Sequence, residues 1–471
     1  MKQALAPDLC IIGAGSAGLA VAAGAAQMGA EVVLIERGEM GGDCLNYGCV
    51  PSKSLLATAR AADLWRRAAG LGISYAPPRI DFAAVGASVQ RVISAIAPND
   101  SVERFEALGV RVVRFHARFT SPRTVIAGEI EIRPRRFVIA AGSRPAIPAI
   151  PGLADVPYLT NESIFANRQL PEHLIVVGGG PVGIEMAQAH CRLGARVTVL
   201  EIGSVLPRDD PELAAGLAQK LSDEGISIRP RIEIVSIQPV GRGICVHLRS
   251  GEQITGSHLL VAAGRRPATD GLDLPAGGIA AGRDGIRVDA RLRTTNRRVF
   301  AIGDVAGGLQ FTHVALYHAG IVIRNALFRI PARVDYRAVP WVTYTEPELS
   351  HVGLTESMAR AQGIVPRVLR WGFTENDRAQ TERDTAGLVK IVTGKSGRIL
   401  GTSILGPGAG DLILPWSLAI SQKLKIRALA ELIVPYPTRG EAGKRAAGCF
   451  YTPSLFSAGT RRLVRLLAYF G

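Results

Sequence analysis

Hydrophobic and polar positions follow the same order in two distant stretches of the chain. Each stretch starts with a short apolar run, passes through a glycine-rich turn and an alanine-rich segment, and ends with a second apolar run and an acid. The stretches read LCIIGAGSAGLAVAAGAAQMGAEVVLIE, from residue 9, and LIVVGGGPVGIEMAQAHCRLGARVTVLE, from residue 174. Short apolar runs beside glycine are typical of buried strands, and the longer segment between them is typical of a helix. The pattern therefore predicts a strand–helix–strand unit that occurs twice.

The turns of both units carry glycines at the spacing G-x-G-x-x-G, followed at equal distance by an acid. The first two glycines permit a tight turn and a close approach to a pyrophosphate, and the third lets the helix pack on the strand. The helix N-terminus holds phosphates, and the acid bonds ribose hydroxyls. Two complete copies predict two dinucleotide sites. The candidate residues are Gly13, Gly15, Gly18 and Glu36 in the first copy and Gly178, Gly180, Gly183 and Glu201 in the second.

The remaining pattern predicts further strands and helices. A helical stretch over 82–108 and a strand over 111–115 follow the first copy. Two similar strand-to-turn segments, FVIAAGSRPAIPAIPG (137–152) and LLVAAGRRPATDGL (259–272), contain Gly142 and Gly264, which we add to the cofactor-binding candidates. From about residue 340 the expected elements are strands at 342–345, 387–393 and 399–405 and helices at 411–422 and 426–431.

These elements predict an α/β fold with two Rossmann-like dinucleotide-binding domains and a separate C-terminal α/β domain. The expected boundaries are 1–150 for the first dinucleotide domain, 151–270 for the second, 271–338 for a return to the first, and 339–471 for the C-terminal domain.

Composition narrows the class of protein. Apolar residues make up 47% of the 471 residues, which indicates a globular chain. The net charge of +15 suits acidic ligands such as dinucleotide phosphates, or an anionic surface. The positive charge is mostly arginine without aromatic interleaving, so nucleic-acid binding is not expected. Asp8 interrupts the N-terminal apolar run, so we expect no signal peptide, and no stretch reaches the length of a membrane span. The expected location is the cytoplasm.

The segment GGDCLNYGCVPSK (41–53) holds two of the six cysteines. In a regular helix, Cα atoms five residues apart lie about 8.7 Å apart, whereas a disulfide needs roughly 4.4–6.8 Å. If Cys44 and Cys49 pair, the helix must be interrupted between them, and Gly48 supplies that freedom. A helix starting at Pro51 would favour a thiolate at Cys49. The segment indicates a reactive dithiol, with two buried free cysteines as the alternative. No second Cys/His pair has metal-site spacing, so no metal site is expected.

Taken together, the motifs resemble those of the FAD-dependent pyridine nucleotide-disulfide oxidoreductases, the group with dihydrolipoamide dehydrogenase, glutathione reductase and mercuric reductase. The resemblance covers nearly the whole chain. It rests on both glycine motifs, GGDCLNYGCVPSK, VFAIGD (299–304) and VTYTEPELSHVGLTE (342–356).

The resemblance implies a role for each candidate. The first unit would bind FAD, with Asp304 near its ribityl or phosphate region, and the second would bind NAD(P)H. Cys44 and Cys49 would form a redox-active disulfide, with Cys49 next to the flavin and Cys44 meeting the substrate. Lys53 would lie near the flavin and pair with Glu185; the alternatives are a surface lysine and an ordinary exposed helix residue. The C-terminal domain would form a homodimer whose partner subunit completes the active site.

The choice between NADH and NADPH depends on the end of the second unit. Glu201 would repel a 2′-phosphate, and the following IGSVLP offers no arginine, although Arg208 is near in sequence. We expect NADH, with NADPH as the alternative.

Two departures from the family pattern bear on the acceptor. Where disulfide reductases of this family carry His-Pro-Thr-x-x-Glu, the chain reads Tyr436, Pro437, Thr438 and Glu441. A phenol is a poor general base at neutral pH, but it can donate a hydrogen bond or stabilise a thiolate. Tyrosine at this position resembles mercuric reductase, yet the C-terminal cysteine pair of that enzyme is missing. The first expectation is a disulfide or dithiol acceptor, and the alternative is a soft metal ion.

The segment SAGTRRLVRLLAYFG (457–471) predicts a basic amphipathic helix. Leu463, Leu466, Leu467 and Phe470 share one face, and three arginines lie elsewhere. We expect this helix to pack on the body of the protein or on a dimer partner. The alternative is peripheral contact with the inner membrane surface, which would make the chain a membrane-associated redox partner protein.

Overall fold

The computed structural model describes residues 3–470, and the chain forms two compact units. Unit 1 comprises the described chain up to Ala59, then Arg79–Leu200 and Ile232–Asp335. Unit 2 comprises Arg60–Pro78, Glu201–Arg231 and the chain from Tyr336 onward. Both predicted dinucleotide units have most of their residues in unit 1, so the predicted boundary between two such domains stays a prediction.

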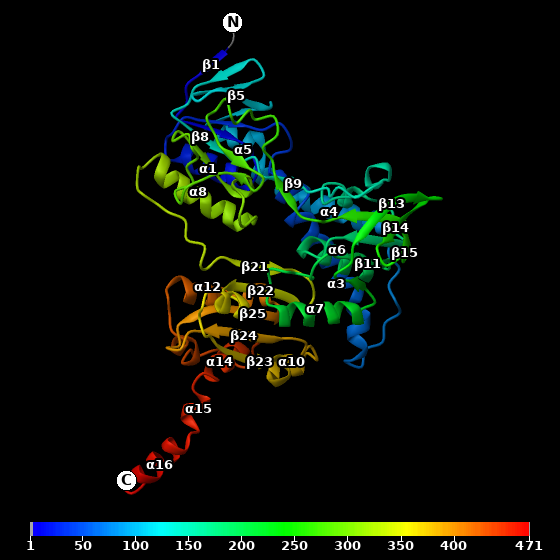
Figure 1. The fold of residues 1–471 in the computed structure, drawn as a ribbon, viewed down its shortest axis with the longest axis vertical. Coiled ribbons are helices and arrows are strands. Elements are labelled where there is room, and N and C mark those ends of the chain that lie inside the picture. The colour runs from blue at the N-terminus through cyan, green and yellow to red at the C-terminus, as the bar shows by residue number, and fades with distance from the viewer. Residues whose placement is uncertain (1–2, 471) are drawn as a thin grey trace. The chain divides into compact units, whose positions relative to one another are not determined.

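The first part of unit 1 is a parallel sheet with the strand order β20-β8-β2-β3-β4. Figure 1 labels strand β8 of this sheet and the helices α1 and α8 of the same region. Alternate residues of its central strands face opposite sides: Leu9 and Ile11 pack with helices α1 and α8, while Cys10 and Ile12 pack towards a second, four-stranded sheet, β1-β7-β6-β5. Both faces are covered, which explains why these strands are almost wholly apolar. The bounds are β1 (Gln3–Leu5), β2 (Leu9–Ile12), α1 (Ser16–Gln27), β3 (Val32–Ile35), β4 (Val110–Val113), β5 (Ala117–Ser121), β6 (Thr124–Ala127), β7 (Ile130–Ile132), β8 (Arg136–Ile139), β20 (Val299–Ala301) and α8 (Thr312–Ala326).

The second predicted unit also folds as expected. Strand β10 pairs in parallel with β11 and with β16, and helix α6 follows β10 through the glycine turn. An antiparallel sheet, β13-β14-β15, packs its apolar side chains with this core. The bounds are η2 (Leu153–Asp155), η3 (Ile164–Ala166), β10 (His173–Val177), α6 (Pro181–Arg192), β11 (Arg196–Leu200), β13 (Ile234–Val240), β14 (Gly243–Leu248), β15 (Gln253–Gly256), β16 (His258–Val261), β18 (Ala281–Gly282), β19 (Gly285–Ile286) and η4 (Gly303–Ala306).

Two predictions for the connecting helices need correction. The predicted helical stretch over 82–108 is three helices, because Pro98 cannot donate within a continuing helix and the chain turns there. The helix expected to start at Pro51 starts at Cys49, since the Gly48 carbonyl already accepts from the Ser52 amide at 3.1 Å. The bounds are α2 (Gly42–Asn46), α3 (Cys49–Ala69), α4 (Phe82–Ile96), η1 (Ala97–Asp100) and α5 (Val102–Ala107).

Unit 2 is built on an antiparallel sheet in the order β21-β22-β25-β24-β23. Trp416, Ile420 and Ala446 bring α12 and α14 into the apolar core beside this sheet. The helix expected over 411–422 is divided into α11 and α12, and strands β22 and β23 were not predicted. The bounds are α7 (Pro211–Asp223), β12 (Ser227–Arg229), β21 (Pro340–Thr343), β22 (Glu348–Gly353), α9 (Glu356–Ala361), β23 (Arg367–Gly372), η5 (Phe373–Glu375), α10 (Asp377–Thr381), β24 (Leu388–Thr393), β25 (Ile399–Gly406), α11 (Ala409–Leu412), α12 (Leu414–Ser421), α13 (Arg427–Ala430), α14 (Glu441–Gly448), α15 (Thr452–Leu455) and α16 (Ala458–Leu467).

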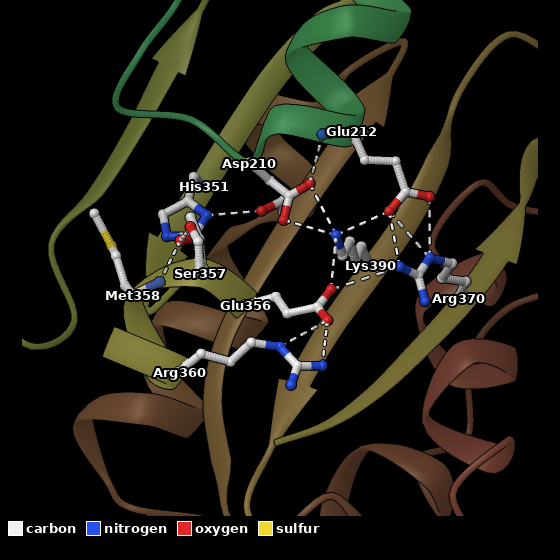
Figure 2. Close-up of polar contacts among 11 residues, drawn as sticks. Asp210, Glu212, His351, Glu356, Ser357, Met358, Arg360, Arg370 and Lys390 are labelled. Atoms are coloured by element: carbon white, nitrogen blue, oxygen red, sulfur yellow. Dashed lines mark hydrogen bonds and ion pairs between the residues drawn. The ribbon is translucent and has the colours of Figure 1, made fainter. Parts of the chain in front are cut away.

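An ion-pair network ties α7 to the sheet of unit 2 (Figure 2). The buried ammonium of Lys390 on β24 lies 2.9 Å from the carboxylate of Asp210, which caps α7, and 2.8 Å from Glu212 in its first turn. Glu356 lies 3.3 Å from the same ammonium, and Arg370 lies 2.9 Å from Glu212. The buried positive charge is therefore compensated by carboxylates from two helices.

The C-terminal helix α16 forms where it was predicted, but none of its residues is buried. The helix therefore does not pack on the rest of unit 2, and the expectation that it packs on the body of the protein or on a dimer partner stays a prediction. Its apolar side chains are exposed, and Figure 1 shows the helix leading away from the sheet of unit 2.

Candidate active site

The two cysteines of the motif lie on separate helices. Cys44 belongs to the short helix α2, and Cys49 is the first residue of α3. The chain leaves helical geometry between them, at Gly48. A Cβ atom there would lie 2.9 Å from the carbonyl oxygen of Asp43 and 3.2 Å from the Cα of Cys44. Only glycine therefore fits where the sequence predicted an interruption.

The surroundings of Cys49 favour its thiolate. Its Sγ lies 3.6 Å from Oγ1 of Thr312, the first residue of α8. A hydrogen bond from Cys44, helped by Thr312 and the charge of Lys53, lowers the pKa of Cys49 to about 6. The same Cys44–Cys49 hydrogen bond, together with burial, raises the pKa of Cys44. In the dithiol state Cys49 therefore carries the negative charge and Cys44 keeps its proton.

Lys53 and Glu185 meet in this structure. Lys53 lies one turn after Cys49 on α3, and its Nζ is 2.7 Å from Oε2 of Glu185 on α6. The Glu185 side chain is only 4% exposed, so it is not an ordinary surface residue, and Lys53 is not an unpaired surface lysine. The pair joins the helix of the cysteine motif to the helix of the second glycine motif.

The first glycine turn has the close backbone approaches that the motif predicts. Gly13 has φ +106°, and a Cβ there would lie 2.4 Å from the carbonyl oxygen of Ala140. A Cβ on Gly18 would lie 1.8 Å from the carbonyl oxygen of Gly13. The carboxylate of Glu36 accepts from the amide of Ala14, inside the turn, at 2.6 Å. The acid therefore lies beside the glycine turn, as a ribose-binding acid must.

The cysteine motif is held against this turn by backbone contacts. The Gly41 amide donates to the carbonyl of Ala14 at 2.9 Å, and Gly15 forms a bridge with Gly41. A Cβ on Gly42 would lie 2.7 Å from the Cα of Gly15. These contacts place the loop that carries Cys44 directly on the first dinucleotide turn.

The second glycine turn repeats the geometry of the first. Gly178 has φ +116°, and its Cβ would lie 2.4 Å from the carbonyl oxygen of Ala262. A Cβ on Gly183 would lie 2.0 Å from the carbonyl oxygen of Gly178, whereas one on Gly180 meets no atom within 4 Å. The carboxylate of Glu201 accepts from the Gly203 amide at 2.7 Å.

Asp304 lies in a polar network that sequence analysis missed. Its Oδ2 accepts from the hydroxyl of Ser143 at 2.6 Å, and the guanidinium of Arg265 donates to the same hydroxyl oxygen at 2.7 Å. Arg265 also lies 3.1 Å from the carboxylate of Asp43, next to Cys44 in the chain. Burial raises the pKa of Asp304. The network connects Asp304 to the cysteine loop.

Gly142 and Gly264 are brought together by a short antiparallel pair of strands, β9 (Ser143–Pro145) and β17 (Arg265–Pro267). The Ala268 amide donates to the Gly142 carbonyl, and the Ala146 amide donates to the Gly264 carbonyl. Both glycines have positive φ, at +72° and +112°, where a side chain would be strained. The two strand-to-turn segments noticed in the sequence thus pair with each other.

Family comparison agrees with this arrangement. Residues 7–319 match the pyridine nucleotide-disulphide oxidoreductase model, and residues 339–447 match the dimerisation domain of the same family. The chain belongs to the pyridine nucleotide-disulphide oxidoreductase family.

Relatives with known activities and structures support the same assignment. A mercuric reductase from Streptomyces lividans is 38% identical, with 94% of this chain and 96% of the relative covered. A dihydrolipoyl dehydrogenase from Thermus scotoductus is 34% identical, with 95% and 98% covered. A Cu(II) complex of the HOCl-induced flavoprotein disulfide reductase RclA from Escherichia coli superposes with a TM-score of 0.84 at 30% identity, with 93% of this chain and 98% of that chain covered.

As a member of this family, the protein is an FAD- and NAD(P)H-dependent oxidoreductase whose reaction uses a redox-active disulfide. The two glycine turns fit the cofactors. In each turn the first and third glycines lie where a Cβ atom would clash with a backbone carbonyl oxygen, and the second glycine, Gly15 or Gly180, has no atom closer than 4.0 Å to the position of a Cβ. The dimerisation domain supports a homodimer. Among residues 3–470, no group of three or more His, Cys, Asp and Glu side chains could hold a metal ion.

In this oxidoreductase Tyr436 and Glu441 belong to unit 2 and have separate partners. The Tyr436 hydroxyl donates to Oδ2 of Asp377 at 2.8 Å, while Glu441 forms an ion pair with Arg445 at 2.8 Å. The bond to Asp377 raises the pKa of Tyr436, so the phenol keeps its proton at neutral pH. The acid of the family motif, Glu441, thus pairs with Arg445, and nothing in the local sequence pointed to Asp377 as the partner of Tyr436.

Proposed function

We propose that Cys44 and Cys49 are the redox-active pair, that Cys49 receives the electrons and that Cys44 delivers them to the acceptor. The observation that carries this proposal is the asymmetry of the two thiols. Cys49 starts α3, 3.6 Å from the Thr312 hydroxyl and one turn before Lys53, and a hydrogen bond from Cys44 together with these neighbours lowers its pKa to about 6. The same hydrogen bond and burial raise the pKa of Cys44, which keeps its proton. A pair with one thiolate and one thiol suits a reaction in which each sulfur has its own task.

The two glycine turns would hold the cofactors. Gly13, Gly15, Gly18, Glu36, Gly142 and Asp304 would hold FAD, and Gly178, Gly180, Gly183, Glu201 and Gly264 would hold the nicotinamide dinucleotide. When bound, FAD would transfer two electrons from NAD(P)H to the protein disulfide. The positive charge of Lys53, fixed by Glu185, would stabilise negative charge that develops beside Cys49. The corresponding domain boundaries are those expected from the sequence.

The favoured acceptor is a disulfide. Cys44 first passes its proton across their hydrogen bond to the Cys49 thiolate. The Cys44 thiolate formed in this way attacks one sulfur of the acceptor, which breaks the acceptor S–S bond, forms a mixed disulfide and releases the first thiolate, and that thiolate takes the proton from Cys49. The Cys49 thiolate then attacks Cys44, which restores the Cys44–Cys49 disulfide and releases the second thiolate. One NAD(P)H and one proton are consumed for two product thiols, counting a proton taken from water. Run in reverse, the same steps oxidise a dithiol and reduce NAD+.

Tyr436 of the partner subunit would supply the hydrogen bond to the departing thiolate. Its raised pKa makes it a donor and a weak base, so proton uptake by the products would rely on water. Glu441 would act as a positioning residue through its ion pair with Arg445.

A soft metal ion is the second candidate acceptor. Tyr436 in place of a histidine and the similarity to mercuric reductase favour it. Two thiolates are good ligands for a soft cation, and the two electrons that arrive at Cys49 would reduce a divalent ion to the metal. The relative determined as a Cu(II) complex adds copper to the ions worth testing.

For the reductant we propose NADH over NADPH. Glu201, which ends the second strand–helix–strand unit, would repel a 2′-phosphate. The Glu201 amide donates to the backbone carbonyl of Arg229 at 3.0 Å, which makes Arg229, besides Arg208, a residue to test for NADPH binding. The single organised cysteine pair supports a cytoplasmic location.

Reoxidation of the NADH-reduced enzyme by different acceptors tests the function. We expect lipoamide or another small disulfide to reoxidise it faster than Hg2+ or Cu2+. The reverse order would replace the disulfide proposal with the metal-ion proposal. A Cys44→Ser variant should lose turnover with either acceptor while its flavin is still reduced by NADH.

A further inference from the structure

The C-terminal helix α16 presents a continuous apolar face that the described chain leaves uncovered. Leu463, Leu466 and Leu467 are each more than half exposed, and Tyr469 and Phe470, which follow the helix, are 86% and 81% exposed. Figure 1 shows α15 and α16 leading away from the sheet of unit 2. Exposed apolar surface of this extent marks an interaction site.

The helix is short for a segment without tertiary contacts. It spans ten residues, and an isolated helix below about 12–15 residues is marginal in water. Ser457 caps it by accepting from the Thr460 amide at 3.1 Å, which stabilises its start. A surface that covers the apolar face would supply the remaining stabilisation.

The polar face of α16 is unusual in this protein. Other short helices of unit 2 pair their arginines with acids one turn away: Arg360 with Glu356, Arg378 with Glu382, Arg427 with Glu431 and Arg445 with Glu441. Within residues 3–470, no ion pair reaches Arg461, Arg462 or Arg465, and residues 442–471 contain no acid at all. The positive charge of α16 is therefore left for an external anion.

The two faces lie on opposite sides of one helix. At 100° per residue, Leu463, Leu466 and Leu467 fall on one side and Arg461 and Arg465 on the other. An apolar face bordered by arginines and followed by aromatic residues is the pattern of helices that lie in the interface of an anionic bilayer. A second copy of this helix could cover the apolar face but would leave the three arginines uncompensated, because the helix contains no acid.

We propose that α16 binds the surface of an anionic phospholipid membrane, with its leucines in the acyl boundary and its arginines at the headgroups. Of residues 3–470, no helix combines the length and apolar character that crossing a membrane requires, so the contact would be peripheral. The inference concerns this surface only and does not depend on the roles proposed for the cysteines.

Sedimentation with vesicles tests the proposal on the full-length holoprotein, with flavin absorbance in the pellet as the readout. We expect the protein to pellet with phosphatidylcholine vesicles that contain phosphatidylglycerol, and not with phosphatidylcholine alone. Raising the salt from about 0.1 M to about 0.5 M should weaken binding. An Arg461→Gln, Arg462→Gln, Arg465→Gln variant should bind about 100-fold more weakly, at roughly 1 kcal/mol per arginine.

A matched variant carries the same charge loss elsewhere in unit 2: Arg360→Gln, Arg378→Gln and Arg427→Gln. It should bind like the parent. No pelleting, equal pelleting with both vesicle types, or equal losses in the two variants would overturn the proposal. A further outcome would also show that the membrane proposal is wrong. If the parent does not pellet with vesicles and truncation after residue 456 converts a dimer to a monomer, the helix binds a second copy of the chain.

Discussion

The ammonium of Lys53 lies 2.7 Å from the carboxylate of Glu185, across 132 positions of sequence. The pair links the helix that begins with Cys49 to the helix of the second dinucleotide turn. Glu185 is almost fully buried and forms an ion pair with this lysine, and the lysine in turn contributes to the low pKa of Cys49.

Replacing Lys53 should therefore have two effects. Lys53→Met leaves the Glu185 carboxylate buried without its cation, and we expect a loss of about 2 kcal/mol in unfolding free energy, below the cost for a fully buried pair because Lys53 is partly exposed. It should also raise the pKa of Cys49. Urea denaturation measures the first effect and the pH dependence of alkylation of the reduced enzyme measures the second. The surface variant Lys395→Met is the control, and parental behaviour of Lys53→Met in both assays would contradict the pairing.

The Thr312 hydroxyl should lower the pKa of Cys49 independently of Lys53. Thr312→Val removes a group 3.6 Å from the sulfur and nearly preserves the shape of the side chain. Since Thr312 lowers the pKa of Cys49, we expect the thiolate to appear at higher pH, by roughly one unit for a net hydrogen bond of about 1 kcal/mol. Alkylation rates of the dithiol enzyme between pH 5 and 8 measure the midpoint, which for the parent should lie near 6. An unchanged midpoint, as expected for the exposed control Thr374→Val, would rule out the contact.

The phenol of Tyr436 should affect the rate at which the acceptor is reduced, and not the rate at which NADH reduces the flavin. Tyr436→Phe removes the hydroxyl that bonds Asp377, and we expect slower reduction of a disulfide acceptor, by about tenfold, with flavin reduction by NADH unchanged. Tyr436→His next to Asp377 should raise disulfide turnover and make it depend on a group that titrates near neutral pH. Rapid-reaction measurement of each half-reaction separates the two effects. Equal losses in both half-reactions would mean that the variants disturb the fold.

A buried acid in unit 2 should make stability depend on pH. Burial raises the pKa of Asp209 to about 6 although its carboxylate accepts from the indole of Trp341. Because the pKa is higher in the folded state than the ordinary value of 3.8, ionisation opposes folding increasingly from pH 4 to pH 6 and to its full extent above pH 6. Asp209→Asn should stabilise the protein by about 2–3 kcal/mol at pH 8, with the gain fading between pH 6 and 4.

Denaturation of the Asp209→Asn variant at pH 8 and pH 4 provides the measurement, and Asp270→Asn, a change at an exposed residue, serves as the control. A gain that does not change with pH would mean that the carboxyl is not the cause.

The glycine turns could be predicted from sequence because their spacing is local and their physical reason is steric. Gly13 and Gly178 both approach a carbonyl oxygen that only a hydrogen atom can tolerate. The interruption between Cys44 and Cys49 was predictable for the same kind of reason. Contacts across long sequence distances were not: Thr312 and Arg265 reach the cysteine loop through the fold of unit 1, Asp377 reaches Tyr436 through that of unit 2, and no spacing marks them.

Strand β22 shows why part of the C-terminal sheet was missed. It buries Ser350 and His351, and the His351 ring bonds to Ser403 on the neighbouring strand at 2.7 Å. A strand whose buried positions are polar does not give the apolar pattern by which strands are recognised. The charge network around Lys390 was equally hidden, because its members come from α7, α9 and two strands.

Anaerobic titration with NADH, followed by visible absorbance, tests the central claim most directly. If Cys49 is the electron-accepting thiol, two electrons should produce the long-wavelength band of a thiolate beside oxidised flavin. Cys44→Ser should show that band without reductant, and Cys49→Ser should never show it. Flavin reduction without the band in the parent, or the band in Cys49→Ser, would contradict the roles assigned to the two cysteines.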